Sequence, residues 1–413
     1  MCLKTGGGLF CIFAIRCNSS WPKIRKMEER IKLSRIYIIA TLIMVLVGIA
    51  ALVMAFMGDP QRGWANLLLN NVYFVSLAAG ALLFVSIQRV THSGWSAGFI
   101  RVPEAMAAYL PVAAVLFLLM IFGAHSLYHW SHAHEVANDP LLAHKAPYLN
   151  LPFWIIRMVI YFTLWILMFM IIRRLSLKED SAGGLEIFKK LEHRSKVYIF
   201  IVIITFTFAM IDWIMSIDAH WYSTIFAIRN FVAAFHHAAI VITFIVLLMN
   251  QRGHFPFLNK SHLGDFARYI FMLCIIWGYF WFAEFMLIWY ANIPEETAYY
   301  IPRVQGEGWR FFFFANIAIN WFIPFVLLMP KATAKNPTFL KIVIPILIVG
   351  QFIDLYIQIF PGTLGEQVLG FQEIGSFVGF AGLFMLVTGW ALSRANLYPV
   401  NHPYMEECKG HHT

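Results

Sequence analysis

The chain has 413 residues, of which 60% are hydrophobic and 13% are charged, and its formal net charge is +9. This composition excludes an ordinary soluble domain, which carries about twice that share of charged residues. Ten apolar runs are each long enough to cross the roughly 30 Å hydrocarbon core of a bilayer, which takes about 20 helical residues. They predict ten transmembrane helices at 36–57, 66–88, 107–124, 152–172, 197–217, 226–249, 266–290, 309–329, 338–360 and 371–392.

The positive charge indicates topology rather than binding of nucleic acid. If the N-terminus is cytoplasmic, six of the 31 Lys and Arg residues fall on or beside the outer segments, namely Arg62, Lys145, Arg157, Arg229, Arg303 and Arg310. The remaining cations lie on the inner side, as the positive-inside rule requires. The sequence therefore predicts an all-α multi-pass membrane protein with both termini in the cytoplasm.

One membrane domain over 36–392 leaves a cytoplasmic N-terminal segment, 1–35, and a cytoplasmic C-terminal tail, 393–413. Met27 opens a stretch that is typical of a natural start, so residues 1–26 are interpreted as a gene-start artefact or a tail. The five cysteines form no CxxC or CxxCH motif, which predicts no iron–sulfur cluster, covalent haem or zinc site.

In the first half of the chain, the first helix is apolar throughout and is expected to face lipid. The outer loop 125–151 follows the third helix and is rich in histidine. Its histidines are His125, His129, His132, His134 and His144. No recognised metal-ligand spacing is present, so we expect a hydrogen-bonded loop that contacts another subunit rather than a metal site. The inner segment 173–196 is amphipathic and predicts a helix on the membrane surface.

Ionisable residues concentrate in the fifth and sixth helices and the loop between them. They are Asp212, Asp218, His220, Arg229, His236 and His237. Asp212 is expected five residues from the outer end of its helix, and His236 and His237 roughly 15 Å deep, near the midplane. An ionised group in hydrocarbon costs roughly 2.5–3.5 kcal/mol or more, so each needs a partner, water or a function.

Three further ionisable residues lie in the outer halves of helices: Arg157 in the fourth, Glu284 in the seventh and Asp354 in the ninth. We find no carboxylate in the inner half of any helix, and no helix interrupted by a Gly-rich unwound segment. His236 and His237 are about 100° apart on a helix, so both cannot face one haem.

The grouping of these ionisable residues in the outer halves of the helices allows three interpretations. The first is a site where a quinol loses protons to a nearby base. The second is a set of structural pairs, such as Arg157 or Arg229 with Asp212 or Glu284. The third is a secondary transporter with a midplane site.

The stretch DWIMSIDAHWYSTIF at Asp212–Phe226 resembles the NrfD/polysulfide-reductase-C-like membrane subunits of alternative complex III. The loop GFIRVPEAM at Gly98–Met106 and the histidine-rich loop are similar to that family as well. The length from Met27 is closer to its ActF type than to the longer ActC type. The resemblance implies two four-helix bundles, helices 2–5 and 6–9, with helices 1 and 10 peripheral, in a bacterial inner membrane.

The resemblance also implies a complex that oxidises menaquinol or ubiquinol. Its expected partners are a sister ten-helix subunit, iron–sulfur and multihaem c-type cytochrome subunits, and a terminal oxidase or cytochrome c as acceptor. The subunit itself would hold no redox centre. It would scaffold the complex and contribute to quinone binding or proton transfer near the outer leaflet.

The family motif carries over only Asp212, Asp218 and His220. The other candidates for proton transfer rest on depth alone, and they are His236, His237, Glu284, Asp354, Arg157 and Arg229. The candidates for contact with quinone are His125, Asp212 and His236, and no metal ligand is expected. A secondary transporter and a purely structural membrane anchor remain as alternatives.

Overall fold

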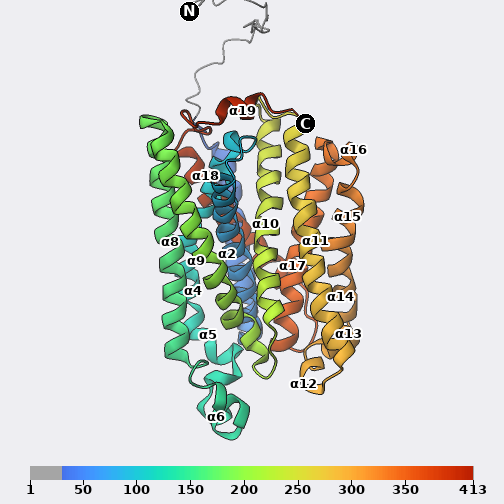
Figure 1. The fold of residues 1–413 in the computed structure, drawn as a ribbon. Coiled ribbons are helices and arrows are strands. Elements are labelled where there is room, and N and C mark those ends of the chain that lie inside the picture. Colours follow the sequence, from blue (N-terminus) through green and yellow to red (C-terminus); the bar gives the residue numbers. More distant parts are fainter. Residues whose placement is uncertain (1–29, 413) are drawn as a thin grey trace, which may run out of the picture.

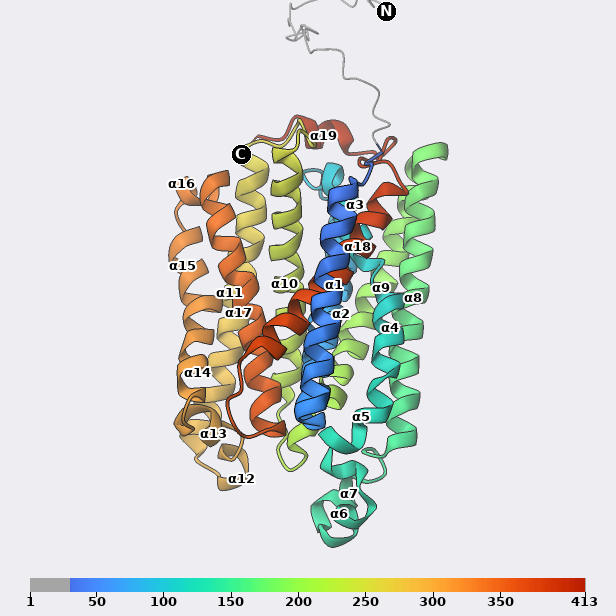
Figure 2. The ribbon, with the colours of Figure 1, turned by 180° about the vertical axis from the view of Figure 1, so that it is seen from behind.

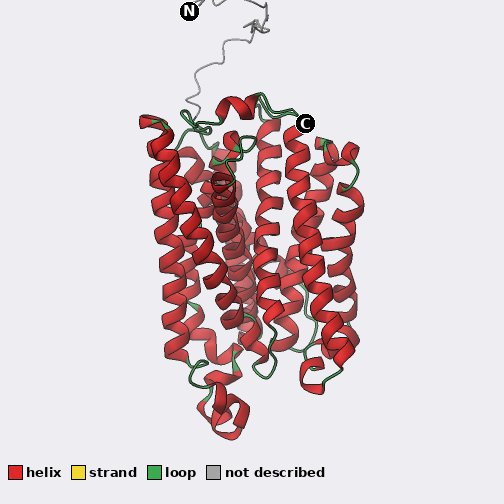
Figure 3. Ribbon diagram, in the orientation of Figure 1, coloured by secondary structure: helices red, strands yellow, loops and turns green. Residues whose placement is uncertain are grey.

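A computed structural model describes residues 30–412, so the interpretation of residues 1–26 lies outside the described part of the chain. Ten helices within it are long and apolar enough to cross a membrane, which confirms the predicted number. Over the same residues there is no strand, and one isolated bridge joins Arg30 to Asn396. The protein is thus an all-α, multi-pass membrane protein (Figure 3).

The spanning helices keep the predicted order. They are α1 (Arg35–Gly58), α2 (Pro60–Val90), the series α3 (Arg101–Ala107), α4 (Leu110–Leu118) and α5 (Met120–Leu127), α8 (Leu151–Ala182), α9 (Leu185–Trp213), α10 (Thr224–Gln251), α11 (Lys260–Ala291), the series α14 (Trp309–Ile317), η4 (Ala318–Phe322) and α15 (Ile323–Leu328), α17 (Pro337–Thr363) and α18 (Phe371–Ser393). Short helical elements join them: η1 (Ala97–Phe99), η2 (His129–Ser131), α6 (Ala133–Asn138), α7 (Pro140–Lys145), η3 (Met215–Asp218), α12 (Pro294–Thr297), α13 (Tyr300–Gln305), α16 (Lys331–Ala334) and α19 (Met405–Lys409).

Polar residues between the apolar runs define where several spans begin. The side chains of Asp59, Asn150, Ser223 and Asn336 each accept a hydrogen bond from a backbone N–H in the first turn of α2, α8, α10 and α17, respectively. Such caps satisfy N–H groups that have no partner within the helix, which is essential where a helix end approaches lipid.

Both ends of the described chain lie at the same end of the bundle, which we call the terminal end and which is uppermost in Figure 1. The opposite end, here the loop end, carries α6 and α7, which project beyond the other helices, together with α12 (Figures 1 and 2).

The helices pack around α2, whose most apolar stretch is completely buried. α2 contacts α9, the α3–α5 series, α10, α17 and α18. α8 and α9 contact each other, as do α10 and α11, while α17 contacts both α14 and α10. α1 packs mainly on α18, and the two helices approach closely where Gly48 meets Gly379: a Cβ added to Gly379 would lie 2.3 Å from the Gly48 Cα.

The surface helix predicted over 173–196 is wrong. α8 and α9 instead continue as 32-residue and 29-residue helices and meet at Gly183 and Gly184, where φ is positive at both residues. At 1.5 Å per residue these helices are roughly 48 and 44 Å long, well beyond the roughly 30 Å core of a bilayer. The mixed charges belong to the terminal-end turns of α8 and α9, one face of which is buried against the rest of the protein.

Two spans are less regular than predicted. The third consists of α3, α4 and α5, with breaks in the helical pattern at Ala108–Tyr109 and at Leu119. The eighth contains the five-residue π-helical segment η4. The residues at these breaks keep right-handed helical backbone angles, so the chain is not unwound there. A π-helical segment inside a span is rare and is frequently found at functional sites.

Candidate functional site

Asp212 forms a buried ion pair with Arg157 of α8 at the loop end. Two guanidinium nitrogens of Arg157 lie 2.8 and 2.9 Å from the two carboxylate oxygens, and the Tyr161 hydroxyl donates a further hydrogen bond of 2.8 Å. The ring of Tyr148 lies 3.9 Å from the Arg157 guanidinium carbon. Asp212 lies in the last turn of α9, because this helix ends at Trp213 rather than at the predicted 217.

Arg229 forms the second buried pair, with Glu284 of α11, at 3.2 Å. Both side chains are almost completely buried, and neither Glu284 oxygen has a hydrogen-bond partner among the described residues. Asp354 of α17 is close enough to act electrostatically on both Arg229 and Glu284. One guanidinium therefore lies within the field of two buried carboxylates.

A row of side-chain amides leads from Asp354 towards the centre of the bundle. Gln351 donates to the Asn320 oxygen at 2.8 Å, Asn320 donates to the Asn316 oxygen at 2.6 Å, and Asn316 donates to Asp354 at 2.9 Å. Asn320 lies in the π-helical segment and also donates to the Gly350 carbonyl oxygen at 2.8 Å. Every amide in the row points its N–H towards the carboxylate of Asp354.

The histidine pair lies at the far end of this row. His236 Nδ1 is 3.4 Å from the Gln351 amide nitrogen, and the ring of His237 contacts that of Tyr73 with 4.0 Å between centroids. Both imidazoles are buried near the middle of α10, and their Nε2 atoms have no hydrogen-bond partner among the described residues.

The loop candidates lie apart from this row. Asp218 pairs with Arg303 of α13 at 3.1 Å, and His220 pairs with Asp139 in the projecting loop. This pairing lowers the pKa of Asp139 below its ordinary value, because the imidazole stabilises the carboxylate.

The residues considered for quinone do not share one set of contacts. His125 is exposed and bonds to the Ser131 hydroxyl at 3.0 Å, whereas Asp212 bonds to α8 and His236 to α17. Within residues 30–412, the contacts of these three side chains do not connect one with another. Quinone binding therefore stays a prediction. Within the same range, no group of three His, Cys, Asp or Glu side chains is arranged to hold a metal ion.

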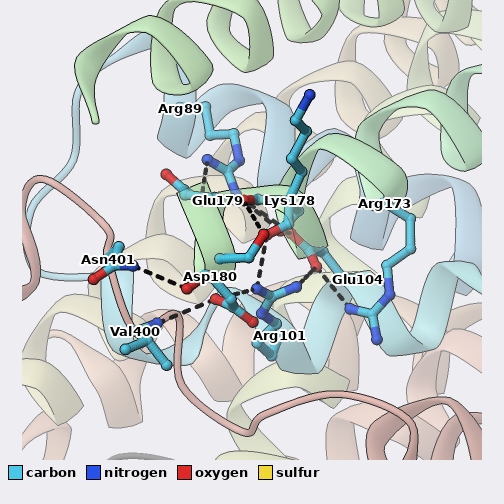
Figure 4. A network of polar contacts seen from close by, with 11 residues as sticks. Arg89, Arg101, Glu104, Arg173, Lys178, Glu179, Asp180, Val400 and Asn401 are labelled. Carbon is cyan, nitrogen blue, oxygen red and sulfur yellow. Dashed lines mark hydrogen bonds and ion pairs between the residues drawn. The ribbon is translucent and has the colours of Figure 1, made fainter. Parts of the chain in front are cut away.

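A second buried cluster of charges lies at the terminal end (Figure 4). Glu104 of α3 lies at its centre, 2.7 Å from Arg173, 3.2 Å from Arg101 and 3.4 Å from Arg89. The three arginines come from α8, α3 and α2, so the cluster joins the ends of three spans.

Two more carboxylates complete this cluster: Glu179 is 3.3 Å from Arg89, and Asp180 is 2.8 Å from Arg101. Asp180 also accepts the backbone N–H of Val400, which ties the C-terminal segment to α8. The prediction that no carboxylate lies in the inner half of a helix is therefore wrong. The helices extend further than their apolar runs: Glu104 lies in the first turn of α3, and Glu179 and Asp180 lie in the last turns of α8.

The buried ionic groups differ in charge balance. The terminal-end cluster has three arginines and three carboxylates, and Arg157–Asp212 and Arg303–Asp218 are one-to-one pairs. Arg62 and Glu373 also form a one-to-one pair, at 2.7 Å. Around Arg229, by contrast, one guanidinium forms an ion pair with Glu284, and a second buried carboxylate, Asp354, is near enough to act on it electrostatically. No other described cation is in ion-pair contact with Glu284 or Asp354.

Tyr300 of α13 connects this unbalanced group with the surface. Burial and the nearby Glu284 carboxylate raise the pKa of Tyr300 well above its ordinary value. The same side chain lines a cavity of about 200 Å³ at the loop end. The other lining residues are Phe285, Ile288, Trp289, Asn292, Thr297, Ile301, Val304 and Gln305. Tyr300 therefore lies between the buried acid and a pocket that opens near the end of α11.

The comparisons with known proteins name no relative. No protein-family model matches the chain, and no curated protein is significantly similar to it. The assignment of a role therefore depends on the geometry and on the sequence resemblance described above.

Two polar groupings carry a spacing signal that the sequence analysis did not use. Asn66 and Asn70 are four residues apart in α2, and their amides donate to Glu373 at 2.9 Å and to Ser376 at 3.0 Å in α18. Asn316 and Asn320 have the same spacing and form the amide row. Repeated amides on one face of an apolar helix predict interhelical hydrogen bonds even when the partner helix is unknown.

Proposed function

We propose that Glu284, Asp354 and Arg229 form a site that holds one exchangeable proton inside the membrane. The observation that carries this proposal is the charge count: in a buried region, Arg229 pairs with Glu284, and a second buried carboxylate, Asp354, acts on the same guanidinium electrostatically. A net negative charge away from water is costly, and two nearby carboxylates avoid it when one of them binds a proton. The other buried ionic groups are balanced and have no such need.

Glu284 is the acid that carries the proton. Asp354 receives an N–H from the amide row, whereas Glu284 receives none from a side-chain amide among the described residues and has the Ser223 and Tyr300 hydroxyls nearby. Arg229 can then balance Asp354. On this proposal the proton belongs to the two acids together rather than to one residue alone.

Tyr300 provides the exit for this proton. Its side chain lies beside Glu284 and also lines the loop-end cavity, with its hydroxyl oxygen itself buried. In the opposite direction, beyond the histidine pair, α10 and α17 bury a run of apolar side chains, including Ile242, Val246 and Ile344. The site therefore exchanges its proton with the loop end.

Infrared spectroscopy tests the site directly. At neutral pH the protein should show the C=O stretch of one protonated carboxyl group. That band should be absent in both Glu284→Gln and Asp354→Asn, because removing either acid restores the one-to-one balance with Arg229. Asp212→Asn, at a balanced pair, should leave the band in place. Absence of the band in the wild type, or its persistence in either of the first two variants, would contradict the proposal.

Tyr300→Phe tests the exit. It should slow exchange of the carboxyl proton with D2O, measured as the shift of the same band with time. Tyr290 is 84% exposed, so Tyr290→Phe serves as a control that should exchange at the wild-type rate. Equal exchange rates in the two variants would show that the proton does not leave through Tyr300. The proposed site at Glu284, Asp354 and Arg229 would be unaffected by that result.

In its wider role, the protein is proposed as the ActF-like membrane subunit of a bacterial respiratory complex that oxidises menaquinol or ubiquinol. The resemblance over Asp212–Phe226 and a buried proton site at one end of the bundle support this proposal. Purification from native membranes tests it. The chain should copurify with iron–sulfur and c-type haem subunits, and Glu284→Gln should reduce the protons released per quinol oxidised. A preparation without haem or iron would exclude the role.

A proton-coupled transporter is the second candidate, and the π-helical segment of the eighth span favours it, because such segments are frequently found at functional sites. Uptake of a solute by the purified chain in vesicles, driven by a pH gradient and lost in Glu284→Gln, would support this candidate over the respiratory one.

A further inference from the structure

The hairpin formed by the terminal-end turns of α8 and α9 carries a band of exposed cations. They are Arg174 and Lys178 on α8, and Lys189, Lys190 and Arg194 on α9. None of the five is in ion-pair contact with a carboxylate of the described residues. Among the exposed residues of the hairpin, Glu186 is the one nearby acid, since Glu192 is half-buried and bonds to Lys196 at 2.6 Å.

The cation band follows directly after a surface that faces lipid. Leu167 and Met170 of α8 are 46% and 38% exposed, and Arg174 and Lys178 continue the same face at helical spacing. On α9, Phe200 is 70% exposed and lies about two turns from the cations. Both helices thus change from apolar to cationic at the depth where hydrocarbon gives way to headgroups.

The position of the hairpin in the fold keeps this band open to lipid. α8 packs mainly on α9 and α4, and it forms the outer edge of the bundle in Figures 1 and 2. Its buried charges, Arg173 and Glu179, face inward to the terminal-end cluster. The buried charges and the exposed cations therefore lie on opposite faces of α8.

We propose that this hairpin is a binding site for the phosphate headgroups of anionic phospholipids. Five cations on two neighbouring helices repel one another unless counter-charges approach, and anionic headgroups lie at the same depth. Each Lys or Arg near an anionic membrane surface contributes about 1 kcal/mol. The site is separate from the proton site at the loop end, and its test does not depend on that proposal.

The experiment uses the full chain in nanodiscs of phosphatidylcholine with a minor fraction of phosphatidylglycerol, with bound lipid counted by native mass spectrometry. The triple variant Lys189→Gln, Lys190→Gln, Arg194→Gln should bind phosphatidylglycerol on the order of 100-fold more weakly. The matched control neutralises three exposed cations elsewhere at the terminal end: Arg252→Gln, Lys260→Gln and Lys331→Gln. This control should retain the bound lipid.

Equal loss in both triple variants would overturn the proposal, because the binding would then follow total charge rather than the hairpin. Retention in the hairpin variant would also overturn it, and would leave an acidic protein surface as the partner of the band. If the hairpin variant does not fold, the wild type is titrated with salt. Binding of phosphatidylglycerol should fall steeply as salt rises, and salt-independent binding would refute a headgroup site.

Discussion

The unbalanced charge around Arg229 leads to a prediction about stability that differs from the usual rule for buried ion pairs. Removing one partner of a buried pair commonly costs about 3–5 kcal/mol, because the other charge is left uncompensated. Asp212→Asn should cost this much, since it leaves Arg157 without the carboxylate that now lies 2.8 Å away. Glu284→Gln should cost no more than about 1 kcal/mol, because Asp354 remains to balance Arg229.

The same reasoning fixes the behaviour of the double variant. Asp354→Asn alone should also be mild, because an amide oxygen can still accept the hydrogen bond that Asn316 now donates at 2.9 Å. Glu284→Gln combined with Asp354→Asn leaves Arg229 uncompensated and should cost about 3–5 kcal/mol. The two substitutions should therefore be strongly non-additive, with a coupling of about 2 kcal/mol or more.

The free energy of unfolding can be measured by steric trapping in bicelles, with Glu307→Gln at an exposed acid as the control. If Glu284→Gln alone destabilises the protein as much as Asp212→Asn does, the two acids do not share one guanidinium. Additive losses in the double variant would lead to the same conclusion, and the proton site would have to be abandoned.

Three further predictions concern other parts of the molecule. Gly379→Ala should cost about 1–3 kcal/mol, because its methyl group would lie 2.3 Å from a backbone Cα of α1, whereas Gly58→Ala, with open space around it, should be neutral in the same unfolding assay. Burial lowers the pKa of His402 to about 3, so the unfolded segment binds a proton that the folded one does not. The packing of the C-terminal segment on the rest of the protein should therefore become less stable as pH falls below about 6.5, by up to about 1.4 kcal/mol per pH unit. Hydrogen exchange at pH 7.5 and 5.5 measures this, and His402→Gln should remove the dependence. The pKa of Asp139 is lowered, so its tether to the α9–α10 loop is complete above about pH 4 and is lost as pH falls further. Asp139→Asn should release the projecting loop to proteases at neutral pH, and an unchanged cleavage rate would exclude the tether.

The number and order of the spans could be predicted because hydrocarbon imposes a long apolar run on every crossing helix. Their ends could not, because a helix continues past the membrane wherever its outer turns find polar partners. Arg173 and Glu179 illustrate this point: in the sequence they belong to a charged segment, but in the fold they are buried against Glu104 and Arg89. Their burial depends on α2 and α3, which contribute from some 70 to 90 residues away in the chain.

The candidate site could be predicted only as a set of residues at similar depth. Depth places Arg229, Glu284 and Asp354 in the same half of the bundle, but it does not say which acid faces which arginine. The structure pairs Arg157 with Asp212 and leaves Arg229 with two acids, and this assignment follows from how α8, α9, α10 and α11 are packed. The charge imbalance is therefore determined by the packing of the helices and cannot be predicted from the local sequence.

The amide row between Asp354 and His236 has a consequence for how charge could cross this protein. A carboxamide conducts hydrogen ions poorly, because relaying one would convert it to an unstable imidic acid. Gln351, Asn320 and Asn316 thus act as an insulating barrier with a fixed dipole direction. A proton held at Glu284 can return to the side from which it came. Its passage along the amide row towards His236 requires the seventh, eighth or ninth span to move.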